Sequence, residues 1–178
     1  GLTGPANTIA TDLTEGVIDR FRSLPVTRTA YLLGHYVAEL AGLALAIVVL
    51  LGAGLVVGWR PHTGIVDIAL GAVLLLVFAS AMIWLGTLVG LSVRSPDAVM
   101  GVAFIVVFPI TFLSAAFVPI ATLPEVLQWV ASWNPVTVMV TAVRELFGNP
   151  TGPVAKAVWP LEHPVAGAFL CCAVVLAL

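Results

Sequence analysis

The segment IALGAVLLLVFASAMIWLGTLVGL, Ile68–Leu91, contains no charged residue and no proline. A helix needs about 20 consecutive apolar residues to cross the hydrocarbon core of a bilayer. This run therefore predicts a membrane span over 68–91. Two further runs are nearly free of charge: LAGLALAIVVLLGAGLVVG, which ends at Gly58, and AVMGVAFIVVFPITFLSAAFV, which ends at Val118. They predict spans over 35–58 and 98–118.

The composition of the whole chain points to the same class of protein. Of its 178 residues, 61% are hydrophobic and 9% are charged, and the mean hydropathy is +1.14. Soluble domains carry about 25% charged residues, so the sequence predicts an all-α integral membrane protein. The net charge of -2 provides no basic face for a nucleic acid.

The two ends of the chain predict incomplete spans, so 1–178 is expected to be a fragment of a single transmembrane domain. Residues 1–13 are moderately apolar and are expected to be the end of a span. Residues 165–178 are apolar but too few to cross a bilayer, and are expected to be the start of a last span. The long segment 119–163 has helical signals of its own.

Lysine and arginine are enriched in cytoplasmic loops, and alternation of the spans divides them into two groups. One side has Arg20, Arg22, Arg28 and Arg94, and the other has Arg60, Arg144 and Lys156. Three arginines of the first group cluster beside a span. We therefore expect that side in the cytoplasm and the segment 119–163 outside.

Residues 14–26 are the most polar part of the chain and include EGVIDRFRSLPV, which starts at Glu15. One face of a helix there would carry Val17, Ile18, Phe21 and Leu24, Pro25 would end it, and the other faces would carry Glu15, Asp19, Arg20 and Arg22. The pattern predicts an amphipathic cytoplasmic helix. Mixed charge suits docking to a protein, whereas a helix on lipid head groups favours lysine and arginine. Composition alone leaves both open.

Three longer stretches stand in a fixed order: LTEGVIDRFRSLPVTR, LLLVFASAMIWLGTLVGLSVRSPDAV and FPITFLSAAFVPIATLPEVLQWVASWNPVTVMVTAVREL. In this order and spacing they resemble the bacterial ABC-2 type permeases, in particular the membrane subunits of daunorubicin-resistance-like drug exporters. The resemblance covers most of the chain between Leu13 and Leu146. It implies the transmembrane domain of ABC-2, or type V, exporters, which has six helices in the family and is partly covered here.

The resemblance implies that 14–26 is the coupling helix, which sits in a groove of a separate cytoplasmic ABC ATPase. The side chains expected at this contact are Glu15, Val17, Ile18, Asp19, Arg20, Phe21, Arg22, Leu24 and Pro25. Phe21 and Leu24 would anchor in the groove, and the charged residues would set the orientation. The family further implies two permeases, identical or homologous, with two ATPase subunits in the bacterial cell membrane.

No motif in the sequence binds nucleotide. A phosphate-binding loop requires G-x-x-x-x-G-K-[ST], and the only lysine, Lys156, follows no glycine-rich loop. No catalytic residue is expected, and the three histidines lack the spacing of metal ligands. The chain is therefore expected to be a transporter subunit and not an enzyme. It would hold no cofactor, since ATP and magnesium would bind the partner ATPase.

A stripe of phenylalanines, Phe104, Phe108 and Phe112, recurs every four residues on one face of the third span. The stripe fits a hydrophobic route between subunits, although ordinary packing or lipid contact explains it more simply. Pro109 lacks an N–H and predicts a kink. Two glycine pairs, Gly54-x-x-x-Gly58 and Gly86-x-x-x-Gly90, predict close helix contacts.

The segment 119–163 predicts two helices that meet at Trp133 and Asn134. Asn134 is placed to cap the second helix, with Pro135 at its first position and Gly148 after its end. The resemblance implies that this is a re-entrant helical region near the extracellular gate. An interfacial hairpin without a gating role fits the same pattern.

The sequence thus predicts a membrane permease subunit of an ATP-driven exporter for hydrophobic drugs or lipid-like compounds. Export of a polysaccharide or another lipid-linked product through the same fold is one alternative. A membrane scaffold that transports nothing is the other, and it would associate with no ATPase.

Overall fold

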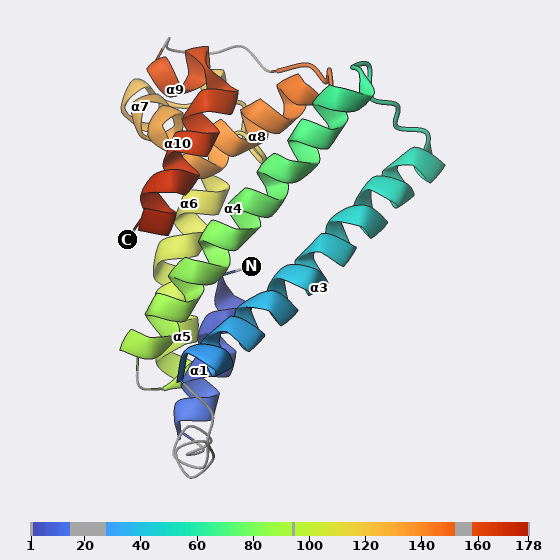
Figure 1. Ribbon diagram of the computed structural model, residues 1–178. Helices are drawn as coiled ribbons and strands as arrows, with labels where there is room; N and C mark the ends of the chain where they lie inside the picture. Colours follow the sequence, from blue (N-terminus) through green and yellow to red (C-terminus); the bar gives the residue numbers. More distant parts are fainter. Residues whose placement is uncertain (1, 15–27, 94, 152–157, 178) are drawn as a thin grey trace.

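The computed structural model describes residues 2–14, 28–93, 95–151 and 158–177, and over these ranges the chain forms helices and no strand (Figure 1). The first helices are α1 (Thr3–Thr14), α3 (Arg28–Val57) and α4 (Ile65–Ser92). They are followed by α5 (Pro96–Val102), the π-helical turn η1 (Ala103–Val107), α6 (Phe108–Phe112) and the short 3-10 turn η2 (Ile120–Thr122). The last are α7 (Glu125–Trp133), α8 (Pro135–Leu146), α9 (Trp159–Glu162) and α10 (Pro164–Ala177).

Two of the described helices are long and apolar enough to cross a membrane: Ala30–Val57 within α3, and α4. The bent pair formed by α7 and α8 would make a third if it is one broken span. The helical content and these two helices confirm the all-α membrane fold. Helix α3 begins before the span expected over 35–58 and ends one residue short of its limit, and α4 extends beyond 68–91 at both ends.

Helix α4 is the element against which most of the others pack. In Figure 1 it runs through the middle of the bundle, with α1 near one end of it and α8 and α10 near the other. The larger buried cluster includes Leu74 of α4, Val138 and Ala142 of α8, and Ala168 of α10. Helix α3 lies alongside α4, where Tyr36 and Ser80 share a hydrogen bond, and most of its other side chains are exposed.

Glycines allow α1 to approach α4 closely, as the Gly86-x-x-x-Gly90 pattern predicts. A Cβ at Gly90 would lie 2.7 Å from the carbonyl oxygen of Ala6, and one at Gly86 would overlap the carbonyl oxygen of Leu2. The prediction for the other pair is wrong. Gly58 follows the end of α3 with a φ of 104°, and a Cβ at Gly54 would meet the ring of Trp59. Within the part of the chain that the structure describes, that pair therefore lies at the end of a helix and contacts no other helix.

The third expected span, 98–118, ends earlier in the structure, because helical geometry stops at Phe112. Two hydrogen bonds to the carbonyl oxygen of Thr111 turn the chain there, one from the backbone N–H of Ser114 (3.2 Å) and one from its hydroxyl (2.6 Å). Serine and threonine side chains compete with helical hydrogen bonds in this way. The expected kink at Pro109 appears as the π-helical turn directly before α6.

A sharp bend of 71° separates α7 from α8. Asn134 stands at the bend, where its side-chain oxygen accepts a hydrogen bond from the N–H of Val136 (2.9 Å) and Pro135 opens α8. Gly148, with a φ of 67°, follows the end of α8. The caps expected from the sequence are therefore present. The amide of Asn134 also donates to the carbonyl oxygen of Ile110 (2.6 Å), which ties α6 to this bend.

The connections between successive long helices lie at alternate ends of the bundle. The end of α1, the start of α3 and the end of α4 lie at one end, and Tyr31 donates a hydrogen bond to Asp12 between α1 and α3. The connection between α3 and α4 lies at the other end, where Thr63 donates to the carbonyl oxygen of Leu146 (2.6 Å) (Figure 1). Which end faces the cytoplasm stays a prediction.

Alanine at Gly90 is expected to destabilise the bundle by about 1–3 kcal/mol, because the added methyl group forces α1 away from α4. The unfolding midpoint of the full-length permease in detergent measures this. Gly42→Ala in α3 is the matched control, since nothing lies within 4 Å of a Cβ at that position. Alanine there is expected to be neutral or stabilising, because it favours helix more than glycine does. An equal loss of stability in both variants would contradict a specific contact between Gly90 and α1.

Two substitutions of Asn134 distinguish the contributions of its two hydrogen bonds. Asn134→Ala removes both the helix cap, worth about 1 kcal/mol, and the donor to Ile110. Asn134→Ser keeps a cap but is too short to reach Ile110. Hydrogen exchange is expected to accelerate both at the start of α8 and around Phe112 in the alanine variant, but only around Phe112 in the serine variant. Unchanged exchange around Phe112 in both variants would show that the tie to α6 is unimportant.

Candidate translocation surface

Four phenylalanine rings form a continuous ladder along the outside of the η1 and α6 region. The ring centroids of Phe104 and Phe108 are 6.1 Å apart, those of Phe108 and Phe112 are 4.3 Å apart, and those of Phe112 and Phe117 are 5.4 Å apart. The exposed fractions of the four side chains lie between 48% and 66%. We call these residues the phenylalanine ladder. Aromatic pairs at such distances attract one another beyond simple burial, so the rings hold each other in register.

The π-helical turn contributes to this register. A step of four residues in an α-helix passes a full turn by about 40°, so a uniform α-helix would spread the rings around its surface. A π-helical turn contains more residues per turn. Phe104 lies inside η1 and Phe108 directly follows it, and their planes differ by 21°. The wider turn therefore compensates for the four-residue spacing.

A shallow apolar groove of about 280 Å³ runs beside the ladder. It is lined by Thr3, Met100, Phe104, Val107, Phe108, Thr111 and Phe112. Thr3 comes from the start of α1, and the other residues come from α5, η1 and α6. No ionisable side chain lines the groove. Its chemistry suits contact with apolar or aromatic surfaces, and it offers no group for acid–base or nucleophilic catalysis.

The far end of the ladder is attached to the α7–α8 bend. Asn134, 7% exposed, donates to Ile110 of α6, and the hydroxyl oxygen of the buried Thr137 accepts a hydrogen bond from the N–H of Ala115 (3.2 Å). Buried hydrogen bonds of this kind hold two elements in one arrangement. A change in the bend would therefore be passed to the segment that carries Phe112 and Phe117.

The expected site residues fall into three groups. Phe104, Phe108 and Phe112 share one surface, Pro109 lies in the first turn of α6, and Asn134 reaches α6. Trp133 does not join them, because its ring is 52% exposed and pairs with Trp129, with centroids 6.4 Å apart. The expected coupling contacts between Glu15 and Pro25 lie outside the described residues and stay predictions.

Met100 and Phe117 are among the residues of this surface that were not expected from the sequence. Met100 precedes Phe104 by the same four-residue step as the ladder, so the pattern could have included it. Phe117 could not be found by helical spacing, because it joins the ladder only after the chain leaves α6. Among the described residues, no group of three or more histidine, cysteine or acidic side chains is placed to hold a metal ion.

Comparison with known proteins places the chain among transporters. The family model for ABC-2 type transporters matches residues 5–147. The daunorubicin resistance ABC transporter permease protein DrrB1 of Streptomyces coeruleorubidus is 32% identical over 142 residues, which cover 80% of this chain and 50% of that protein. No solved structure gives a significant match.

Two proteins of Mycobacterium tuberculosis (strain ATCC 25618 / H37Rv) are more distant relatives. The probable doxorubicin resistance ABC transporter permease protein DrrC is 27% identical over 92% of this chain, and the doxorubicin resistance ABC transporter permease protein DrrB is 27% identical over 95% of it. The chain covers 58% of each, so it spans between half and three-fifths of the relatives it matches. With its family model matched over most of its length, the chain belongs to the ABC-2 type transporter family.

Proposed function

We propose that the chain is part of a membrane permease that exports hydrophobic drugs or lipid-like compounds from a bacterial cell, driven by a separate ABC ATPase. The observation that carries the proposal is the exposed phenylalanine ladder beside an apolar groove, in a chain of the ABC-2 type transporter family. The relatives named for resistance to daunorubicin and doxorubicin support a cargo with flat aromatic rings.

The ladder is suited to a path between two permease copies. About half of each of its side chains is left exposed by the described residues. A second permease, identical or homologous, would enclose this face and leave an apolar route between the two copies. An aromatic cargo molecule would move along the ladder by replacing its contact with one ring by a contact with the next. The ladder contains no charged side chain, so passage of an apolar molecule would leave no charge without a partner.

We propose that the ATPase acts on the permease through the segment 14–26. The helices that flank it, α1 and α3, end and begin at the same end of the bundle, and Tyr31 and Asp12 join them there. Helix α1 is in turn packed closely on α4 through Gly86 and Gly90. A push on this segment would therefore reach the central helix through rigid contacts. ATP and magnesium would be bound by the ATPase and not by this chain.

The coupling proposal predicts the behaviour of the double variant Phe21→Asp with Leu24→Asp. Two carboxylates on the apolar face of the proposed helix would abolish docking, because each would be buried in the groove without a partner. We expect the ATPase to be lost from the purified complex and ATP-dependent export to fall at least tenfold, with normal insertion of the permease. Ser23→Asp adds a carboxylate to the other face and is the matched control. Normal export by the double variant would overturn the assignment.

The path proposal predicts that Phe108→Ala weakens export of daunorubicin, since it removes an inner ring of the ladder that contacts both Phe104 and Phe112. We expect a threefold to tenfold rise in drug accumulation, given that a lost aromatic contact is worth about 0.5–1.5 kcal/mol. Cells that produce the complete permease with its ATPase provide the assay. Leu50→Ala is the control, because Leu50 is 73% exposed on α3 away from the ladder. Equal accumulation in both variants would contradict a role for the ladder.

A further inference from the structure

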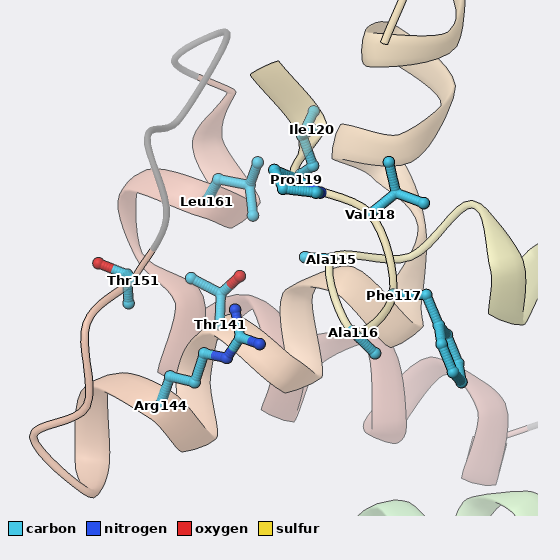
Figure 2. A pocket seen from close by; sticks show the side chains of 10 residues that line it. All are labelled: Ala115, Ala116, Phe117, Val118, Pro119, Ile120, Thr141, Arg144, Thr151 and Leu161. Carbon is cyan, nitrogen blue, oxygen red and sulfur yellow. The ribbon is translucent and has the colours of Figure 1, made fainter. Parts of the chain in front are cut away.

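A second pocket, separate from the groove beside the ladder, lies between α8, α9 and the connection that follows α6. Its volume is about 230 Å³. Figure 2 shows the side chains that line it, which are Ala115, Ala116, Phe117, Val118, Pro119, Ile120, Thr141, Arg144, Thr151 and Leu161. Nothing in the proposed transport path uses its interior. Only Phe117, at its rim, also belongs to the ladder.

One cationic group lies in this pocket. The guanidinium of Arg144 extends beside Thr141 into the space between Thr151 and Ala115 (Figure 2). Within the described ranges, Arg144 makes no ion pair and its side chain makes no hydrogen bond. Its position in the last turn of α8 suits the helix dipole, but the five N–H donors of the guanidinium remain unused by the described residues.

The groups around Arg144 favour an anion. No acidic side chain lines the pocket. The exposed hydroxyl of Thr151 is a second donor, whereas the hydroxyl of Thr141 already donates to the carbonyl oxygen of Thr137 (2.9 Å). Guanidinium groups bind carboxylate and phosphate through paired hydrogen bonds. An oxyanion would therefore supply the acceptors that Arg144 lacks.

The other walls of the pocket are apolar. Pro119, Ile120 and Leu161 face the space opposite the guanidinium (Figure 2). A volume of about 230 Å³ is below the roughly 300–1,000 Å³ of pockets that enclose a whole small molecule. The pocket has room for a charged head and the first part of an apolar chain, and not for a drug-sized cargo.

The end of the bundle that contains the pocket has side chains typical of the boundary between lipid and water. Exposed tryptophans gather at the same end of the bundle, namely Trp129 and Trp133 of α7 and Trp159 of α9. Tryptophan is enriched at the boundary between lipid and water. Anionic phospholipids are the abundant molecules at that boundary which combine an oxyanion with apolar chains.

We propose that this pocket binds the head group of an anionic phospholipid. The phosphate oxygens accept hydrogen bonds from Arg144 and Thr151, and the start of an acyl chain lies against Pro119, Ile120 and Leu161. The site is distinct from the proposed export path and does not depend on it. A bound lipid would link α8, α9 and the connection after α6.

Titration of the purified full-length permease with phosphatidylglycerol in a neutral detergent tests the site, with bound lipid counted by native mass spectrometry. Arg144→Gln is expected to weaken retention of phosphatidylglycerol at least tenfold. Arg60→Gln is the matched control, because Arg60 is an exposed arginine at the same end of the molecule. Equal retention by wild type and a folded Arg144→Gln variant would overturn the proposal.

Two further measurements keep the outcome decisive. If Arg144→Gln does not fold, Thr151→Val removes an exposed donor at little risk to the fold and is expected to weaken retention about threefold; unchanged retention overturns the site. Millimolar inorganic phosphate is expected to leave phosphatidylglycerol bound, because it lacks the apolar chain. Full displacement by phosphate would assign the pocket to a free anion and reject the lipid.

Discussion

Small polar side chains satisfy the backbone groups that are freed where the helices of this protein break. In an apolar surrounding every such N–H and C=O needs a partner within the protein. Asn134 bonds Ile110 and Val136, Thr137 bonds Ala115, and Ser114 bonds Thr111. These bonds fix the course of the connection after α6. That connection carries the last ring of the ladder and forms one wall of the arginine pocket, so both surfaces depend on the same few hydrogen bonds.

Hydropathy was sufficient to predict α3 and α4, because long runs without charge have no other stable structure in a bilayer. It overestimated the third span, because Ser114 and its neighbours are apolar enough to extend the run but bond their own backbone and end the helix at Phe112. Glycine spacing was right for Gly86 and Gly90 and wrong for Gly54 and Gly58. The pattern indicates where a backbone can be approached, but not whether another helix is there.

The candidate site was predictable in the parts that follow helical spacing. The phenylalanine stripe could be derived from a four-residue step, and the Asn134 cap from its place before a proline. The tie between Asn134 and Ile110 joins residues far apart in the sequence and has no local signal. Trp133 was expected at the path or gate together with Asn134, yet its ring pairs with Trp129, four residues earlier on the same helix α7. Arg144 was expected only as one of the charges on one side of the membrane, since its pocket is assembled from residues far apart in the sequence.

The π-helical turn has a consequence for how the aromatic surface can change. Such a turn holds roughly one residue more than an α-helical turn, and each residue of an α-helix winds the chain by about 100°. Tightening η1 into α geometry without removing a residue would therefore rotate α6 against α5 by about that angle. Phe108 and Phe112 would rotate together around the helix axis, and their rings would no longer be aligned with the ring of Phe104. The alignment of these rings is thus set by how tightly the backbone winds, and side-chain rotamers follow.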